Sequence, residues 1–338
     1  MVGVTGKGAV FLGPDIVCDG FIDNVGFRVQ SHIHDDHMTM FSTSKGRQDI
    51  YMSKQSYELL LERKNADLCF RSNIRYLEFG QSAKVGNSEI TLLSSGHMLG
   101  AAQTHVRREN GLNLGYSGDF SWPIDDVIQV NKLVVDCTCG NPNMKRNYSQ
   151  AEADEKLIEL ISLNQSNGPI VLKAFRGTLQ RALDRISGEI NLPLIVTKST
   201  YGEMQIYQRY GYNTSNIHSL AEESTNEILE TKKYILVLRS GEKNPAILPN
   251  WTTITLSAFM TNPNDPVIEH GGNSYTVILS EHADFDGTLE YIKATGAREV
   301  VTDNSRGGNA VVLASEIRSK LNIKVRPSCS DFNREWGA

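Results

Sequence analysis

Ser31-His32-Ile33-His34-Asp35-Asp36-His37 is the stretch that decides both the fold and the chemistry of this chain. Three of the chain's eight histidines fall here within six positions, directly after a predicted strand at residues 27–30. Residues two apart in an extended segment point the same way, so His32 and His34 can converge on one ion, and a turn then brings Asp36 and His37 to a second point nearby. Imidazole and carboxylate groups without thiolate favour a zinc, manganese or iron site that is not purely structural. The alternative, a polar loop with accidental histidines, is disfavoured by their density.

Two further residues share the character of this motif. His97 follows Gly96 in a loop after a predicted strand at residues 89–94, and Asp119 follows Gly118 at the end of a predicted strand at residues 113–117. A lone histidine or aspartate at a strand end is more often structural than a metal ligand. Their order and their strand-end position after the first motif indicate that both belong to the same metal site.

Composition places the chain among globular proteins and sets limits on its partners. Its 338 residues, 40% hydrophobic and 22% charged, suffice for one large domain or two ordinary ones. Five scattered cysteines suit a reducing compartment. No signal peptide and no run of about 20 apolar residues is visible, so we expect a cytoplasmic protein without a membrane partner. The net charge of −5 argues mildly against a general nucleic-acid binder, although bound divalent cations would offset it locally.

The texture of the sequence changes twice along the chain. The first part has short alternating strands, one helix at residues 54–64 and a hairpin signal at Asn110-Gly111. From about residue 149, helices and strands alternate, beginning with an amphipathic helix at 151–163, which is typical of a parallel α/β unit. Strands return after residue 263, and a final helix is expected at 310–321. We therefore expect residues 1–150 and 263–338 to form one core domain, with residues 151–262 inserted as a cap.

The order of the ligand motifs resembles that of the metallo-β-lactamase superfamily. This resemblance implies that His32, His34 and His97 bind a first metal, that Asp36 and His37 bind a second, and that Asp119 bridges the two. It also implies a supporting role for Asp19, thirteen residues before His32, as the aspartate on the preceding strand that orients the metal-binding histidines.

Other motifs resemble the β-CASP branch of this superfamily. Val134-Val135-Asp136-Cys137-Thr138-Cys139-Gly140 is similar to the acidic motif that opens the branch, and Leu279-Ser280-Glu281-His282-Ala283-Asp284-Phe285 is similar to its distal histidine motif. The stretch from Lys173 to Arg181 resembles bacterial ligase-associated DNA exonucleases and Artemis-type DNA nucleases. The implied fold is of the α/β class, an αββα metallo-β-lactamase sandwich with an inserted α/β β-CASP cap domain. His282 would complete the ligand set of the second metal, with Asp136 beside it as an orienting or proton-transfer group.

The implied function is that of a metal-dependent nuclease that hydrolyses phosphodiester bonds with a metal-activated hydroxide. Its cofactor would be one or two zinc ions, with manganese as the alternative. Asp36, Asp136 and His282 would be catalytic, and Lys173, Arg176 and Arg181 would contact the nucleic acid. Asp303 stands where many RNA-processing members have a histidine, and Artemis-type nucleases also lack that histidine, so an exonuclease-like activity on DNA is favoured. The alternatives are an RNA-processing β-CASP ribonuclease, a small-molecule phosphodiester or ester hydrolase, and a non-catalytic binding module.

Overall fold

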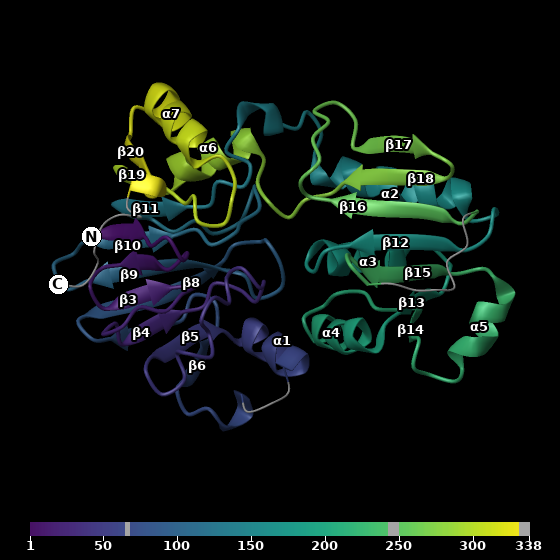
Figure 1. The fold of residues 1–338 in the computed structure, drawn as a ribbon, viewed down its shortest axis with the longest axis horizontal. Coiled ribbons are helices and arrows are strands. Elements are labelled where there is room, and N and C mark those ends of the chain that lie inside the picture. The colour runs from purple at the N-terminus through teal and green to yellow at the C-terminus, as the bar shows by residue number, and fades with distance from the viewer. Residues whose placement is uncertain (65–67, 243–249, 331–338) are drawn as a thin grey trace. The chain divides into compact units, whose positions relative to one another are not determined.

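The computed structural model describes residues 1–64, 68–242 and 250–330, and it divides the chain into two compact units. Unit 1 combines Met1–Lys145 with His282–Ala338, and unit 2 is Arg146–Glu281. In Figure 1 the yellow C-terminal elements of unit 1 lie together with its purple and blue N-terminal strands. No helix in the described part of the chain is long and apolar enough to cross a membrane. The expected α/β class is confirmed by three mixed sheets with helices packed beside them.

The first sheet of unit 1 is built from consecutive strands. Its order is β1-β2-β3-β4-β5-β6, antiparallel up to β3 and parallel from there on. The strands are Val2–Val4, Val10–Leu12, Ile16–Cys18, Phe27–Val29, Asp49–Ser53 and Ile74–Leu77. Helix α1 (Lys54–Lys64) follows β5 without a break and contacts β5 and β6. Its bounds match the helix that the sequence predicts.

The second sheet of unit 1 joins the two ends of the chain. Its order is β20-β19-β11-β10-β9-β8-β7, in which β20, β19, β11 and β10 are parallel and the rest antiparallel. The strands are, in chain order, Ser82–Val85, Ser88–Ser94, Ala102–Arg108, Asn113–Tyr116, Lys132–Val135, Glu299–Thr302 and Lys324–Pro327. The predicted hairpin is confirmed, since β9 and β10 pair antiparallel around Gly111, whose φ is +80°.

Unit 1 has layers because its second sheet is apolar on both faces. Val134 of β11 and Val301 of β19 belong to a core shared with the first sheet. Their neighbours Leu133 and Val300 point the other way, into a core formed with α6 (Phe285–Ala294) and α7 (Ala310–Leu321). Side chains alternate across a strand, so a strand covered on both faces reads as a continuous apolar run, as Leu133-Val134-Val135 does.

Unit 2 is a parallel sheet with one antiparallel edge strand. Its order is β14-β13-β15-β12-β16-β18-β17, and only β17 runs antiparallel to its neighbour. The strands are, in chain order, Ile170–Ala174, Leu194–Val196, Ile217–Ser219, Ile235–Arg239, Thr252–Ser257, Val267–Gly271 and Ser274–Ile278. The helices are α2 (Gln150–Asn164), α3 (Thr178–Glu189), α4 (Lys198–Arg209) and α5 (Thr225–Thr231). The described part of the chain also contains the short 3-10 helices η1 (Leu68–Phe70), η2 (Pro142–Met144) and η3 (Ser328–Ser330).

The boundary of the insert lies further along the chain than the sequence texture indicates. We expected the insert to end at residue 262, but β17 and β18 continue the sheet of unit 2, because β18 pairs in register with β16 from Ser274 to Ile278. Unit 2 therefore extends to Glu281, and the returning part of unit 1 begins at His282.

A buried ion pair links the two sheets of unit 1. Asp303, directly after β19, accepts a hydrogen bond of 2.7 Å from Nη1 of Arg306. Nη2 of Arg306 donates to the carbonyl oxygen of Gly8, in the turn between β1 and β2, at 2.6 Å. Asp303 also accepts hydrogen bonds from the backbone and hydroxyl of Ser305, so both of its carboxylate oxygens are used inside unit 1.

We predict that Asp303→Asn lowers the free energy of unfolding by about 3 kcal/mol, because it leaves the buried Arg306 guanidinium without its counter-charge. A urea titration measures this. The control is Glu316→Gln, which breaks the partly exposed Lys320–Glu316 pair on α7 and should change stability by less than about 0.5 kcal/mol. Equal effects of the two substitutions would refute the buried role of Asp303.

Candidate metal centre

The histidine motif occupies the loop that follows β4, and its alternation brings two imidazoles together. Ile33 is fully buried in the core, while His32 and His34 on either side of it face one another. Nε2 of His32 lies 3.1 Å from Nδ1 of His34. The extended geometry expected for this segment therefore produces a pair of converging ring nitrogens.

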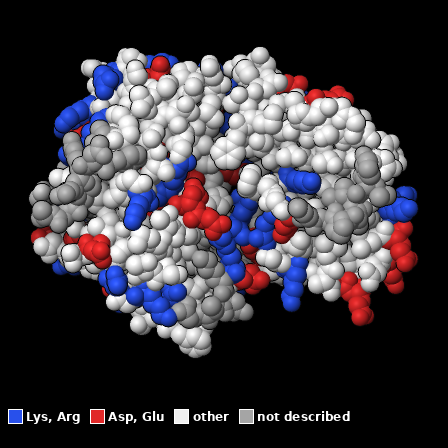
Figure 2. Space-filling view, in the orientation of Figure 1, with Lys and Arg blue, Asp and Glu red and all other residues white. Residues whose placement is uncertain are grey.

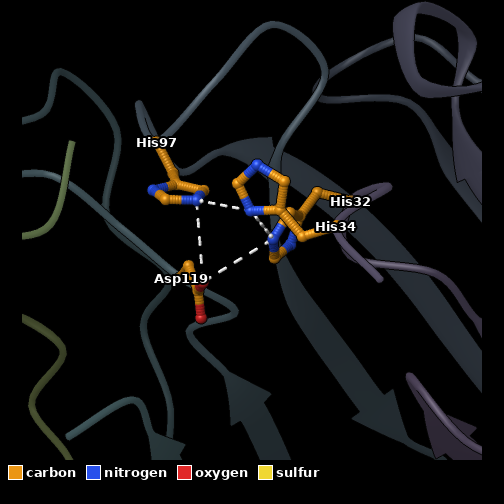
Figure 3. Close-up of side chains that lie close together, drawn as sticks. All are labelled: His32, His34, His97 and Asp119. Atoms are coloured by element: carbon orange, nitrogen blue, oxygen red, sulfur yellow. Dashed lines mark hydrogen bonds and ion pairs between the residues drawn. The ribbon is translucent and has the colours of Figure 1, made fainter. Parts of the chain in front are cut away.

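His97 and Asp119 reach the same point from the other sheet. Nε2 of His97 lies 3.2 Å from Nδ1 of His34, and Oδ2 of Asp119 lies 3.6 Å from Nε2 of both His32 and His97. Figure 3 shows the three rings and the carboxylate turned toward one another. The ligand atoms of these four residues lie within 4.8 Å of one another, so the group could hold a metal ion.

Gly96, before His97, and Gly118, before Asp119, lie where the packing leaves no room for a side chain. A Cβ on Gly118 would lie 2.8 Å from the carbonyl oxygen of Ala102, and one on Gly96 would lie 2.3 Å from Oγ of Ser121. Both glycines also have positive φ values, +57° and +70°, which side chains disfavour. The glycine-flanked pattern noted in the sequence thus sets the approach of His97 and Asp119.

A second group shares the Asp119 carboxylate. Asp119, Asp136 and His282 also present ligand atoms within 4.8 Å of one another. Nε2 of His282 lies 3.9 Å from Oδ2 of Asp119, and Nε2 of His37 lies 3.1 Å from its Oδ1. Asp36 lies at the rim: its side chain is 57% exposed, with Oδ2 3.6 Å from Nε2 of His37. Asp119 therefore belongs to two overlapping groups, whereas Asp36 and His37, which the sequence predicts as ligands of the second metal, are in neither of them.

Asp136 holds His282 in orientation. Its Oδ1 accepts hydrogen bonds from the backbone and the hydroxyl of Thr138, at 2.9 and 2.8 Å. Its Oδ2 lies 3.2 Å from Nδ1 of His282, which turns Nε2 of that ring toward Asp119. Burial opposes protonation of His282, but the hydrogen bond to Asp136 and the charges of Asp119 and Asp136 together raise the pKa of the ring.

The electrostatics of the centre favour a cation. Burial disfavours a charge on His37, yet Asp119 and Asp19 together raise its pKa to about 10. Burial and the charge of His37 lower the pKa of His32 well below its usual value, so this ring is neutral and able to bind a metal. Nε2 of His37 is buried and, among the described residues, has no aligned hydrogen-bond partner. A buried donor set of imidazole and carboxylate groups, in which the Asp119 carboxylate lies 3.1 Å from Nε2 of His37, fits a divalent ion.

Asp19 holds the histidine loop in place through hydrogen bonds to Ser31 and His37. It is fully buried, and its φ of +53° is in the left-handed region that few residues other than glycine adopt. Its carboxylate accepts hydrogen bonds from the backbone and hydroxyl of Ser31, at 2.7 and 2.5 Å, and from Nδ1 of His37, at 2.7 Å. A carboxylate bonded to the far nitrogen of a metal-binding histidine fixes the orientation and tautomer of the ring.

Two supporting residues, Arg28 and Gln30, were not predicted from the sequence. Gln30 is fully buried, and its Nε2 donates to Oδ1 of Asp19 at 3.1 Å and to the carbonyl oxygens of His32 and His37 at 2.7 and 3.0 Å. Its Oε1 accepts from the guanidinium of Arg28, also fully buried, at 2.7 Å. Their alternation with the apolar Phe27 and Val29 is the sequence feature that could have indicated a buried polar network.

Of the three residues of unit 2 that were predicted to contact the substrate, the two arginines form ion pairs with carboxylates. Arg176 bonds to the carboxylate of Glu203 at 3.0 Å. Arg181 pairs with Asp154 at 2.7 Å and with Glu281 at 3.3 Å. Lys173 is partly buried on β12. Each arginine would have to share its guanidinium with a carboxylate in order to bind a phosphate.

Comparisons with known proteins leave the function of the chain open. No family model matches it. A protein of Acidianus ambivalens described as "Uncharacterized protein in lig 3'region" is 28% identical over 138 residues, which is 40% of this chain and 98% of that protein. A solved structure, a protein of unknown function from Enterococcus faecalis V583, is similar in fold, with a TM-score of 0.56 and 14% identity over 82% of this chain and 74% of that one.

We predict that Asp19→Asn weakens zinc binding by about 10- to 100-fold, because the amide cannot accept all the hydrogen bonds that orient Ser31 and His37. Competition with a chromophoric chelator measures the affinity, and circular dichroism checks the fold. Asp23→Asn, which alters a side chain that is 78% exposed, is the control. Unchanged affinity in the folded Asp19 variant would rule out its supporting role.

Proposed function

We propose that this chain is a metal-dependent hydrolase of the metallo-β-lactamase superfamily, from its β-CASP branch, that cleaves phosphodiester bonds in nucleic acid. The observation that carries the proposal is the shared carboxylate of Asp119, which belongs to both ligand groups. A carboxylate placed between two sets of imidazoles is what a bridged pair of ions requires. The order of the ligands along the chain is that of the superfamily.

The arrangement of unit 1 agrees with this proposal. Two sheets share an apolar core, and α6 and α7 cover the outer face of the second sheet. The ligands lie on loops that follow β4, β8 and β10, with His282 at the start of the returning segment, and Asp136 lies on the loop after β11. Unit 2 interrupts unit 1 between Lys145 and His282, the place where the β-CASP branch carries its cap.

In the proposed reaction His32, His34, His97 and Asp119 would hold one ion, and Asp36, His37, His282 and Asp119 a second. Such ions supply Lewis acidity for a phosphoryl oxygen and acidify water to a pKa of about 7. The Asp136 carboxylate keeps a proton on Nδ1 of His282 and so fixes its Nε2 toward the centre. Asp19 does the same for His37 through Nδ1.

We favour DNA over RNA as the substrate, with an exonuclease-like action, and zinc over manganese as the metal. Asp303 stands where many RNA-processing members of the branch have a histidine, and its oxygens are bonded to Ser305 and Arg306. An RNA-processing ribonuclease is the alternative within the same branch.

A small-molecule phosphodiester or ester hydrolase is the second candidate, and the charge of the protein favours it. The net charge is −5, and Arg176 and Arg181 are both paired with carboxylates. Figure 2 shows basic and acidic side chains close together among the described residues on the face that it displays. A nucleic-acid enzyme would ordinarily carry a basic patch.

We predict that Asp36→Ala lowers cleavage of an end-labelled DNA strand by about 100-fold or more in the presence of zinc or manganese, because it removes a ligand while its exposed side chain leaves the fold intact. Gel analysis of 5′- and 3′-labelled strands measures the rate and the product pattern. The same assay uses labelled RNA and a generic small phosphodiester.

The matched control is Asp35→Ala, because Asp35 is the neighbouring exposed carboxylate and its side chain pairs with Arg63. This variant should cut at close to the normal rate. Normal cleavage by Asp36→Ala would contradict the site assignment. Turnover of the small phosphodiester without cleavage of either polymer would replace the nuclease with the second candidate.

A further inference from the structure

In the sheet of unit 2 the chain leaves the neighbouring strands β12 and β16 in opposite directions along the sheet. After β12 the chain passes through α3 to β13, on one side of β12 in the sheet. After β16, which is the other neighbour of β12, the chain goes to β17 and β18 on the opposite side. In open parallel sheets such a divergence leaves a crevice at the carboxyl ends of the strands, where ligands bind.

Two exposed phenylalanines lie at this point. Phe175 directly follows the last residue of β12, and Phe259 follows the end of β16 by two residues. Their relative exposures are 56% and 62%, and their ring centroids are 6.3 Å apart with an angle of 89° between the planes. Met260 beside them is 39% exposed. Exposed aromatic residues that contact each other mark an interaction surface rather than scattered surface residues.

Cationic side chains lie along the same edge of the sheet. Arg176 follows Phe175, Arg239 ends β15 directly opposite Ala174 of β12, and Lys198 opens α4 just after β13. Because β12, β13, β15 and β16 are parallel, their carboxyl ends share one edge.

The two arginines are held in place by one buried carboxylate. Nη2 of Arg176 and Nη1 of Arg239 lie 3.0 and 3.7 Å from Oε1 of the fully buried Glu203. Glu242 lies 3.9 Å from Nε of Arg239. These two arginines, with Lys198, outnumber the two carboxylates by one charge. The side chains of Arg176 and Arg239 are 11% and 19% exposed, so the edge combines exposed ring faces with guanidinium groups that a phosphate would share with Glu203.

We infer that the carboxyl edge of the unit 2 sheet binds unpaired bases of a single-stranded nucleic acid, which stack on Phe175 and Phe259. The adjacent cations would contact the phosphates on either side of the stacked bases. Base stacking on aromatic rings combined with cationic contacts to the backbone is how proteins bind single strands without reading their sequence. This inference rests on the proposed function for its choice of ligand, since an apolar protein segment would use the rings alone and a nucleic-acid strand would use both the rings and the cations beside them.

The test is the binding of a fluorescent 12-nucleotide deoxythymidine strand by the full-length protein, followed by anisotropy with and without a chelator, so that binding is separated from cleavage. The double variant Phe175→Leu/Phe259→Leu should bind about 10-fold or more weakly, because leucine keeps the apolar volume but lacks the ring face. Phe175→Tyr should bind normally. An abasic strand of equal length should bind weakly, and to the same extent, to wild type and double variant.

Phe70→Leu is the matched control, because Phe70 of unit 1 is 85% exposed and lies outside the sheet of unit 2. Unchanged binding by the double variant, equal binding of the abasic strand by wild type, or no binding of any strand would overturn the inference. Self-association of the protein that the double variant abolishes, without an effect on strand binding, would assign the rings to protein contacts and also overturn it. Binding as described without cleavage under any metal would support this site while refuting the nuclease.

Discussion

The geometry of the candidate metal centre depends on one buried carboxylate, that of Asp19. A fully buried charge is costly unless it is paired and hydrogen-bonded, and Asp19 accepts bonds from Ser31, Gln30 and His37. The charge and hydrogen bond of His37 lower the pKa of Asp19 despite its burial, which otherwise raises it. This network fixes the loop after β4 in the shape that directs two histidine rings toward Asp119.

The same geometry is unfavourable without a cation. Nδ1 of His34 lies 3.1 Å from Nε2 of His32 and 3.2 Å from Nε2 of His97 in a largely buried site. Asp119 adds a carboxylate whose pKa is held well below its usual value by His37, against the effect of burial. A proton on His37 offsets part of this charge. A divalent ion would satisfy these groups together, so metal binding should contribute to the stability of unit 1. Arg28 and Gln30 hold the histidine loop in place through hydrogen bonds, and the ring nitrogens that this loop presents would be stabilised by a bound cation.

Much of the site could be predicted from the sequence, because its ligands follow strands whose apolar alternation is clear. His32, His34, His97, Asp119 and His282 lie far apart in the chain and come together as expected. The alternation of Arg28 and Gln30 was visible in the sequence, but their supporting role could not be predicted, since their partners belong to a loop whose path no local pattern specifies. Helices α1 and α7 matched their predicted bounds, while β17 was missed because it is a polar edge strand. The end of the insert was misplaced because it depends on the pairing of β18 with β16, which is a tertiary contact that no local sequence pattern reveals. Likewise, the carboxylate partners of Arg176 and Arg181 come from other elements of unit 2.

The most direct test of the account is a crystal structure of the zinc-loaded protein with anomalous diffraction recorded on both sides of the zinc absorption edge. The account predicts anomalous peaks within ligand distance, about 2.0–2.2 Å, of the histidine nitrogens and aspartate oxygens around Asp119. One peak should lie among His32, His34 and His97, and a second beside His37 and His282. Anomalous peaks of zinc at other positions of the protein, with no peak beside Asp119, would contradict the account.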